Sequence, residues 1–532
     1  MRRRVTTGCV LPCLYPKRGT LPPGASVPST PGRPRFQSRG WLRGGIGRDS
    51  AVYAFPTRCG GMMTPESPSD RALTDLAEAM DGRLVRAYDD DWDSARAPWN
   101  LAIDQRPVAV AYPAGPEDLR RILAAARADG HRVVVQPRGH GPSGDLAGCI
   151  LVRTSAFDEI VIDQKRRVAR VGSGVSWGAL LSRLDGSGLV ALAGSNPDVS
   201  VAGHVLGGGH SWFSRWRGIA ARSIRAVELV DAGGEPRRVT ADSDPELLWA
   251  LRGGGGLFGI VTTLEIDLYS APDLFGGTIV FPASAAGTVF GSVAAIMADA
   301  PPELSIFFGL TNLPDIEQVP APLRGQTIAS AEVVFVGTAE DAAPLLAPLL
   351  ASAPVLADET RPFTIGHLAE VAAEPTEPAA TIEWTAAITS FAGGDEAGLG
   401  ALARAFQEAT PAGLTVLGLR ALGGAIAEQG ADAAAVAGRL DARFLAFAGS
   451  FLTEQRPADP ETVFGPLRRA LEGSTLGLTL PTFLTAGQDL TFSFPPESLE
   501  RLANVKRRLD PGGIFVGNRP LGPGAAATTD TD

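Results

Sequence analysis

Short apolar runs alternate with a helical pattern from about residue 100 onward. Residues 107–113 and 131–136 are apolar enough for buried strands. The stretch between them repeats apolar residues at a helical spacing, begins at Pro116 and stops at Gly130, so it predicts a helix. Five further strands are expected at 149–154, 158–163, 166–172, 224–231 and 259–268. A second helix is expected at 176–186. This pattern predicts an α+β domain with many short strands and glycine-rich connections.

Beyond about residue 273, glycine clusters become rarer and alanine more frequent. Apolar runs typical of strands lie at 276–281, 304–310, 330–337, 381–391, 414–424 and 443–452. Amphipathic stretches typical of helices lie at 339–352, 395–409 and 460–472. Because strands and amphipathic helices alternate, this half predicts one sheet covered by helices on one face. A last helix ends at Asp510, before Pro-Gly-Gly, and a strand follows it.

One stretch is long and apolar enough to be tested as a membrane span. Residues 274–298 carry no charged side chain. Pro282 divides them into a strand-like first half and a helix-like second half of small residues. We therefore expect a strand, a turn and a helix of a folded domain here, and no membrane partner.

Charge is spread unevenly along the 532 residues, whose formal net charge is −10. Residues 1–61 contain eleven basic residues and one acid, together with three of the four cysteines. Residues 62–532 therefore carry a net charge of −20. Such an acidic body gives no electrostatic reason to bind nucleic acid. So few cysteines cannot form the disulfide framework of a small secreted domain.

The basic first segment shows no sustained apolar periodicity. We expect residues 1–65 to be a disordered extension, with Met62 and Met63 as an alternative start. Three arginines after Met1 resemble the charged part of an export signal, but the apolar stretch behind them is short and broken by prolines. We favour the extension over a signal and expect a cytoplasmic protein. Residues 523–532 are expected to form a frayed tail.

Three glycine-dense stretches, 136–148, 193–218 and 246–262, carry the candidate chemistry. Glycines allow the backbone N–H groups of a loop to approach an anion closely. The first stretch follows a strand and has His140 at its centre, where packing does not require an imidazole. For an isolated Gly-His-Gly, a turn with an incidental histidine is the commoner interpretation. The second mixes apolar residues with glycines, which a plain loop does not explain.

These stretches match none of the common nucleotide-binding or metal patterns. The run from Gly253 has Phe258 where a dinucleotide-binding fingerprint needs glycine, and it precedes a strand rather than a helix. The chain contains no G-x-x-x-x-G-K-[ST] and no H-E-x-x-H. Cys9 and Cys13 have no matching second pair for a structural zinc site. A P-loop NTPase is therefore disfavoured and no metal is expected.

In their order and approximate spacing, the three stretches resemble the FAD-linked oxidases with a vanillyl-alcohol-oxidase-like (PCMH-type) flavin domain, in the berberine-bridge-enzyme-like branch. The similarity covers roughly residues 100–521 and includes 419–447 and the last predicted strand. It implies an α+β, two-domain fold whose flavin domain is split in sequence. Residues 100–272 and 476–522 would form the PCMH-type flavin domain, and 273–475 a substrate domain with an antiparallel sheet.

The resemblance also implies which residues contact FAD. The expected cofactor-binding residues are Arg138, Gly139, His140, Gly141, Pro142, Ser143, Asn196, Val199, Gly203, His204, Gly207, Gly208, Gly259, Ile260, Val261 and Asn518. His140 matches the histidine that in this family bonds covalently to the flavin 8α-methyl group. Asn196 stands where many relatives have a second linking cysteine, so a single covalent bond is expected. Cys149 matches no linking position and is expected in the core.

The chain departs from the family pattern at the expected catalytic base. Family members often carry Tyr-x-Asn near the C-terminus, but Leu480 and Thr482 occupy those places here. All five tyrosines precede the substrate domain. Glu383 and Glu428 remain as candidate bases, although each is more typical of a solvated surface carboxylate. The catalytic residue is therefore left unassigned.

Together these features predict an FAD-dependent oxidoreductase. It would move a hydride from a small organic substrate to flavin N5, and dioxygen would reoxidise the flavin. The alanine-rich substrate domain favours a mostly apolar substrate, with a sugar not excluded. Two alternatives remain: a flavin dehydrogenase that uses another electron acceptor, and an FAD-binding protein that has lost catalysis.

Overall fold

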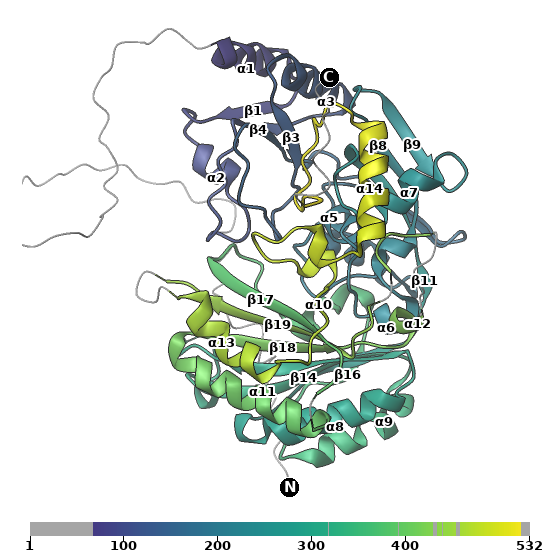
Figure 1. The fold of residues 1–532 in the computed structure, drawn as a ribbon. Coiled ribbons are helices and arrows are strands. Elements are labelled where there is room, and N and C mark those ends of the chain that lie inside the picture. Colours follow the sequence, from purple (N-terminus) through teal and green to yellow (C-terminus); the bar gives the residue numbers. More distant parts are fainter. Residues whose placement is uncertain are drawn as a thin grey trace, which may run out of the picture.

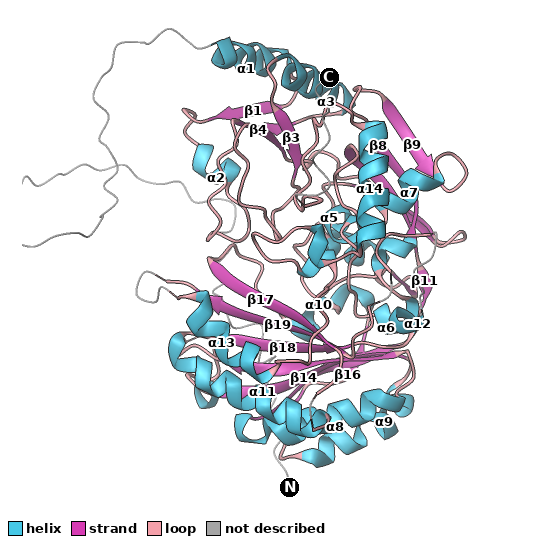
Figure 2. Ribbon diagram, in the orientation of Figure 1, coloured by secondary structure: helices cyan, strands magenta, loops and turns pink. Residues whose placement is uncertain are grey.

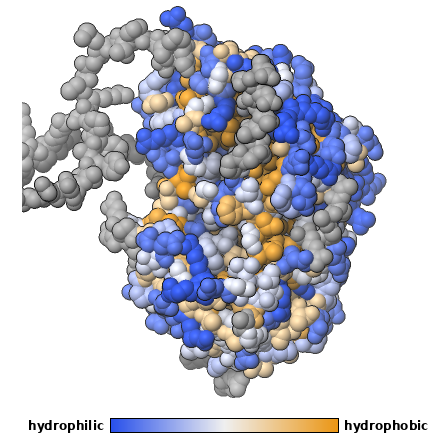
Figure 3. Space-filling model, in the orientation of Figure 1, coloured by the Kyte–Doolittle hydropathy of each residue, from blue (hydrophilic) through white to orange (hydrophobic). Residues whose placement is uncertain are grey.

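The computed structural model describes residues 68–522, apart from 318, 392, 429–433, 439 and 454–457. The expected extension 1–65 and tail 523–532 lie outside the described residues. Two small sheets occupy the upper half of the molecule as drawn, and one large sheet with its helices occupies the lower half (Figure 1). On the face drawn in Figure 3, polar residues dominate the surface and apolar residues gather in separate patches.

The first sheet has four short strands in the order β1 (Arg83–Arg86), β2 (Ala109–Tyr112), β4 (Cys149–Val152) and β3 (Arg132–Val135). Strand β1 is antiparallel to β2, whereas β4 runs parallel to both of its neighbours. Helix α3 (Pro116–Ala128) connects β2 to β3 and buries the apolar face that the sequence predicted. The expected strand–helix–strand unit is thus present, with β4 inserted between its two strands. Cys149 is fully buried, as predicted.

Helix α1 (Pro68–Ala79), β1 and helix α2 (Trp92–Arg96) precede the start of the flavin domain predicted at residue 100. They belong to the same layer, because β1 pairs with β2 and α1 packs against α3. The strand is only four residues long and has an arginine at each end, so its apolar signal is too short to be recognised.

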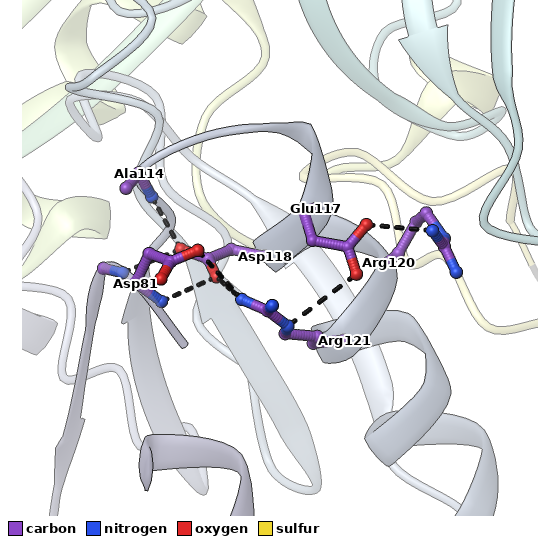
Figure 4. Close-up of polar contacts among 7 residues, drawn as sticks. Asp81, Ala114, Glu117, Asp118, Arg120 and Arg121 are labelled. Carbon is purple, nitrogen blue, oxygen red and sulfur yellow. Dashed lines mark hydrogen bonds and ion pairs between the residues drawn. The ribbon is translucent and has the colours of Figure 1, made fainter. Parts of the chain in front are cut away.

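A buried aspartate joins this layer together (Figure 4). The carboxylate of Asp118, at the start of α3, accepts hydrogen bonds from the N–H groups of Asp81, Gly82 and Ala114. Burial alone would raise the pKa of Asp118, but these three N–H groups and Arg121 hold it below its ordinary value. The ionised side chain therefore fixes β1 to the N-terminus of α3.

The second sheet is antiparallel, with strands β5 (Ile160–Asp163), β6 (Val168–Gly172), β10 (Ile260–Asp267), β8 (Ile224–Val230) and β9 (Pro236–Thr240) in that order. Four of these strands coincide with the predicted runs, and β9 is additional. Helices α4 (Trp177–Leu184), α5 (Val201–Leu206) and α7 (Pro245–Leu251) contribute their apolar residues to its core. A two-stranded ribbon, β7 (Leu189–Val190) with β11 (Tyr269–Ser270), completes this half.

The third sheet has eight antiparallel strands. Its main order is β15 (Ala357–Asp358), β12 (Leu274–Pro282), β14 (Thr327–Val336), β13 (Leu304–Asn312), β18 (Val416–Ala421), β19 (Phe444–Phe451) and β17 (Thr381–Ile388), and β16 (Arg361–Phe363) also pairs with β12. The six strands predicted after residue 273 are all present. This sheet places residues that are far apart in sequence next to one another.

Four helices cover one face of this sheet, as predicted: α8 (Ala286–Asp299), α9 (Ala339–Ser352), α11 (Asp395–Ala409) and α13 (Pro460–Ala470) (Figures 1 and 2). The opposite face contributes Phe307 and Leu445 to the core shared with the upper half. Residues 274–298 form β12 and α8, so the expected strand, turn and helix are confirmed. Within the described ranges, no helix is both long enough and apolar enough to cross a membrane.

The end of the chain returns to the upper half. Helix α14 (Pro496–Leu509) packs against α7, and Phe515 forms a parallel bridge with Val133 of β3. Lys506 donates to the carbonyls of Leu257 and Phe515, each at 2.8 Å. We keep the predicted domain boundaries as a proposal that these contacts support. The remaining short helices are α6 (Ser214–Arg217), α10 (Ala369–Ala372) and α12 (Ala425–Glu428).

Candidate active site

A cavity of about 1250 Å³ lies between the glycine-rich loops of the upper half and the uncovered face of the eight-stranded sheet. All three glycine-dense stretches contribute to its wall, together with residues 516–519 near the C-terminus. Most of the predicted cofactor-binding residues line it: Arg138, Gly139, His140, Gly141, Asn196, Val199, Gly203, His204, Gly207, Gly259, Val261 and Asn518. Pro142, Ser143, Gly208 and Ile260 are outside the lining.

The first loop follows β3 directly. Gly139 has a φ of +79°, and a Cβ at this position would lie 2.4 Å from Gln136 Nε2, so only glycine fits there. In the described part of the chain, no acceptor is present for the backbone N–H groups of Gly139, His140 and Gly141. These donors are therefore available to a ligand in the cavity.

The imidazole of His140 is held by two residues outside the predicted set. Its ring stacks on Trp99 with centroids 4.9 Å apart, and its Nε2 lies 3.5 Å from an oxygen of Asp198. Asp198 also forms an ion pair with Arg138 at 2.5 Å. The side chain of His140 is 17% exposed. The ring is thus fixed at the cavity wall, as a bonding or orienting role requires.

The second stretch supplies the start of α5 and the loop before it. Asn196 donates from Nδ2 to the carbonyl of Pro375 at 2.8 Å and accepts the N–H of Asp198 at 2.9 Å. Ser200 caps the helix by accepting the N–H of Gly203. The amide that replaces a linking cysteine therefore has a structural role of its own.

Two histidines follow in the same stretch, His210 buried and His204 half-buried. His204 Nε2 lies 3.0 Å from the carbonyl oxygen of His210, and burial lowers the pKa of His204 to about 4. Burial also lowers the pKa of His210 well below its ordinary value, with Arg420 and His204 as further causes. Both imidazoles are therefore neutral near pH 7, and the Nδ1 of each is buried without a hydrogen-bond partner among the described residues. His210 is absent from the predicted site.

The third stretch lines the cavity between Gly253 and Val261. Gly255 and Gly256 line the cavity, and a Cβ at either position would have no atom within 4 Å. Ile260 instead packs in the core between the first two sheets, which explains why it does not reach the cavity.

Asn518 brings the C-terminal segment onto the first loop. Its Oδ1 accepts the N–H of Ser143 at 2.9 Å, and its Nδ2 donates to the carbonyl of Gly141. The neighbouring Arg519 donates to the carbonyls of Leu484 and Thr485. Burial lowers the pKa of Arg519 to about 10. Asn518 thus holds the first glycine-rich loop against the C-terminal segment, and Arg519 ties that segment to residues 484–485.

Replacing Asn518 by alanine should weaken FAD binding about tenfold, because two hydrogen bonds that shape the Gly141–Ser143 backbone are lost. FAD affinity would be measured by equilibrium dialysis in the His140→Ala background, so that a covalent link cannot mask dissociation. Asn504→Ala, on the exposed side of α14, is the matched control. Equal affinity in the Asn518 and Asn504 variants would contradict the positioning role of Asn518.

The sheet side of the cavity contains two charged residues that are absent from the predicted site. Glu332 of β14, Phe307 of β13 and Arg420 of β18 stand opposite one another on adjacent strands. Because directly opposed residues share a face of the sheet, all three point towards the cavity that they line. A charged residue inside an otherwise apolar strand was the available sequence signal for both Glu332 and Arg420.

The expectation that Glu383 is exposed to solvent is wrong. It is not a solvated surface carboxylate: it lines the cavity, and burial raises its pKa, although a hydrogen bond from Thr381 opposes this shift. Glu428 is exposed, as expected, and does not line the cavity. Strand β17 is at the edge of the sheet that faces the upper half, so its burial depends on tertiary packing.

The segment that replaces Tyr-x-Asn also reaches the cavity. Pro481, Thr482 and Phe483 form a single 3₁₀ turn in its wall, and the hydroxyl of Thr482 is buried without a partner among the described residues. The described tyrosines, Tyr88, Tyr112 and Tyr269, do not line the cavity. The catalytic base stays unassigned.

A large ligand with several polar groups fits these walls. The unpaired N–H groups of the first loop and the open space over Gly255 and Gly256 suit a pyrophosphate. Buried polar atoms of the lining without protein partners, among them Ser173 Oγ and His204 Nδ1, suit the heteroatoms of a ring system. The residues present thus agree with the FAD that the sequence predicts.

Residues 107–240 match the family described as FAD binding domain. FAD-dependent monooxygenase FUP4 of Fusarium proliferatum is 32% identical over 212 residues, which make up 38% of this chain and 41% of that protein. (R)-6-hydroxynicotine oxidase of Paenarthrobacter nicotinovorans is 32% identical over 206 residues, 38% of this chain and 44% of that protein. These matches span about two fifths of the length of the relatives.

The fold extends the similarity over most of the chain. The solved structure of BBE-like 1 from Physcomitrella patens superposes with a TM-score of 0.72 at 19% identity, covering 85% of this chain and 99% of that one. The chain therefore has the fold of this berberine-bridge-enzyme-like structure. The resemblance predicted from the sequence is confirmed.

Proposed function

We propose that this protein is an FAD-linked oxidoreductase that oxidises a small organic molecule. One observation carries the proposal: a single cavity is lined by the glycine-rich loops of the FAD binding domain and by the uncovered face of the eight-stranded sheet. Such a cavity can hold a cofactor on one side and a substrate on the other. The named relatives, a monooxygenase and an oxidase, support redox chemistry at this site.

FAD would supply the electron-accepting ring that takes a hydride from a substrate C–H bond. The residues of this chain would bind FAD and orient it in the cavity. Backbone N–H groups of Gly139 to Gly141 would bind the pyrophosphate, and the glycines at 253–256 leave room beside it. Neutral His204 and His210 can donate or accept a hydrogen bond without adding charge near pH 7.

His140 is proposed as the residue that bonds covalently to the flavin. Its ring lies at the cavity wall, and stacking on Trp99 and the contact with Asp198 limit its rotation. A carboxylate beside one imidazole nitrogen also makes the other nitrogen a better nucleophile. Because Asn196 occupies the position of the second linking residue, a single bond is proposed.

Dioxygen is the proposed electron acceptor, and a dehydrogenase that uses another acceptor is the alternative. The two are separated by photoreducing the flavoprotein without air and then mixing it with aerated buffer. Rapid reoxidation with stoichiometric hydrogen peroxide supports the oxidase. Slow reoxidation by air, together with fast reoxidation by an artificial acceptor, supports the dehydrogenase.

Acid precipitation tests the cofactor and its bond together. We expect yellow flavin in the precipitate of the full chain, and free flavin in the supernatant after His140→Ala. His367→Ala, which removes an exposed histidine outside the cavity, should leave flavin in the precipitate. Flavin found only in the supernatant of the unchanged protein contradicts the covalent bond, and protein without flavin contradicts the whole proposal. Flavin that no compound of a substrate library reduces would instead favour an FAD-binding protein without catalysis.

A further inference from the structure

We propose that Glu332 and Arg420 together bind one weakly acidic hydroxyl group, such as that of a phenol or an enol, on a planar and largely apolar substrate. Arg420 donates a hydrogen bond to the hydroxyl oxygen, and Glu332 accepts the hydroxyl proton. The inference rests on the proposed function, because it names the substrate class of the same cavity.

The register of the sheet places the two charges on either side of one strand. Glu332 and Arg420 are both opposite Phe307, on β14 and β18 respectively. Neighbouring strands are about 4.8 Å apart, so the two backbones are separated by about 10 Å. Two long side chains that line the same cavity can both reach a small group placed between them. No direct ion pair joins them among the described residues, so a ligand oxygen can enter between them.

The guanidinium of Arg420 is positioned before any ligand binds. It lies over the ring of Phe307 at 4.7 Å and over that of Phe483 at 4.9 Å, and Trp212 stacks behind Phe307 at 3.7 Å. Its one hydrogen bond within the described chain runs from Nη2 to Ser195 Oγ at 3.3 Å. A guanidinium has five N–H donors, so several remain for an oxygen in the cavity. Burial lowers the pKa of Arg420, but nearby Glu374 and Glu332 favour its charged form.

Glu332 is the complementary acceptor. The hydroxyl of Ser330 donates to one carboxylate oxygen at 3.2 Å, which leaves acceptor capacity on the other oxygen. Burial raises the pKa of Glu332 to about 7, and Glu374 raises it further, whereas Ser330 and Arg420 lower it. The group therefore changes charge near neutral pH, where it can both take and return a proton.

The walls around the pair are apolar and flat. Phe447 and Phe483 line the cavity beside Arg420. In the next row of the sheet, Gly309 stands opposite Gly418, and a Cβ at Gly418 would have no atom within 4 Å. A floor without side chains between aromatic rings accommodates a planar ring system.

Charge balance favours a neutral hydroxyl over a carboxylate. Arg420 already lies 3.9 Å from Glu374 and feels the charge of Glu332. A further anion would bring a third negative group next to a single cation, which is unfavourable in a buried site. A neutral hydroxyl instead satisfies a free donor and a free acceptor at once. His210, which faces Phe307 and Phe483, is neutral and does not alter this balance.

Binding of three matched naphthalenes tests the inference without turnover. The purified full chain, with whatever flavin it carries, would be dialysed against 2-naphthol, 2-methoxynaphthalene or 2-naphthoate. We expect 2-naphthol to bind about tenfold more tightly than its methyl ether, which cannot donate a proton, and more tightly than the anion. The preference should grow as the pH rises through about 7, where Glu332 ionises and becomes a stronger acceptor.

Variants of Glu332 and Arg420 test whether these two residues bind the hydroxyl group of 2-naphthol. Glu332→Gln should reduce the preference to about threefold and remove its pH dependence. Arg420→Met should weaken binding of both 2-naphthol and its ether, because both oxygens accept a hydrogen bond from Arg420. Arg420→Lys keeps the charge and guards against loss of folding in the methionine variant. Glu428→Gln, at an exposed glutamate outside the cavity, should bind like the unchanged protein. Unchanged binding of 2-methoxynaphthalene to Glu332→Gln shows that this variant keeps an intact cavity.

Three results would overturn the inference: equal binding of 2-naphthol and its ether, tighter binding of 2-naphthoate, or a preference that Glu332→Gln leaves unaltered. The flavin content of the same samples separates this outcome from failure of the proposed function. A flavin-free chain that keeps the hydroxyl preference refutes the redox function alone. A flavin-loaded chain without the preference refutes the Glu332–Arg420 site alone.

Discussion

Replacing Asp510 by alanine is expected to destabilise the folded protein by about 3–5 kcal/mol. Asp510 follows α14, its side chain is 1% exposed, and it pairs with the ammonium group of Lys506 at 2.5 Å. Its two oxygens also accept the N–H groups of Ile514 and Phe515, each at 2.9 Å. Alanine would leave the Lys506 cation buried without its counter-ion and would leave two N–H donors unpaired.

The substitution of Asp510 should also weaken contacts outside α14, because Lys506 has further partners there. Its ammonium group also donates to the carbonyls of Leu257 and Phe515, so it joins the third glycine-dense stretch to the C-terminal segment. Burial lowers the pKa of Lys506, while Asp510 raises it. Without Asp510, we expect Lys506 to lose its proton more readily and the segment that carries Asn518 to detach from β3.

Urea-induced unfolding of the unchanged protein and of Asp510→Ala measures the loss in free energy of unfolding. Hydrogen exchange at residues 514–516 shows whether the C-terminal segment is the part that loosens. Glu500→Ala, at an exposed position of the same helix, should change the free energy of unfolding by no more than about 0.5 kcal/mol. In a double-mutant cycle, Lys506→Met should recover part of the loss by removing the unpaired charge. Equal stability of the Asp510 and Glu500 variants would contradict this account.

Replacing Arg215 by methionine is expected to cost about 3 kcal/mol or more of stability. Arg215 is 4% exposed and lies on α6. Its guanidinium donates to the carbonyls of Ala300, Leu304 and Leu422. Methionine has nearly the same length but no donor, so two buried carbonyls and one partly buried carbonyl of the eight-stranded half would lose this partner.

Arg215 also connects the two sides of the cavity. It lies within the second glycine-dense stretch. Its acceptors lie just before β13, at the start of β13 and directly after β18, and these are the strands of Phe307 and Arg420. We therefore expect Arg215→Met to loosen ligand binding as well as to lower the unfolding midpoint by several degrees. Burial lowers the pKa of Arg215, so its hydrogen bonds must offset the burial of the charge.

Thermal unfolding and hydrogen exchange at residues 300–305 and 420–423 would measure both effects. Arg183→Met, which makes the same chemical change at an exposed position of α4, is the control. The Arg215 substitution should raise exchange in both segments, whereas the Arg183 substitution should raise it in neither. Unchanged exchange at Ala300 and Leu422 would show that the contacts of Arg215 do not hold the two halves together.

Local pattern alone predicted most elements because each has a clear apolar period. Helix α3, with its proline start and glycine stop, and the six long strands after residue 273 are examples. Strand β1 was not predictable in this way, since four residues are too few to show a period. Its place in the sheet depends on pairing with β2 and on the N–H groups that Asp118 accepts.

The candidate site, like the fold, was predictable from the sequence only in part. The glycine-dense stretches predicted an anion-binding loop, because a loop that approaches a pyrophosphate needs glycine whatever surrounds it. The prediction of FAD and of a role for His140 came from the family resemblance that these stretches carry. The partners of His140 were not predictable. Trp99 precedes β2 and Asp198 lies just before α5, and only packing brings both to one imidazole.

By itself, the sequence determined the cofactor class and the order of the long helices and strands. Tertiary structure alone decided which carboxylates are buried, since Glu332 and Glu383 line the cavity while Glu428 is exposed. The physical reason is that burial and charge pairing depend on strand order and register. The pairing of β14, β13 and β18 sets Glu332 beside Phe307 and Arg420, although nearly ninety residues separate the two charges in the chain.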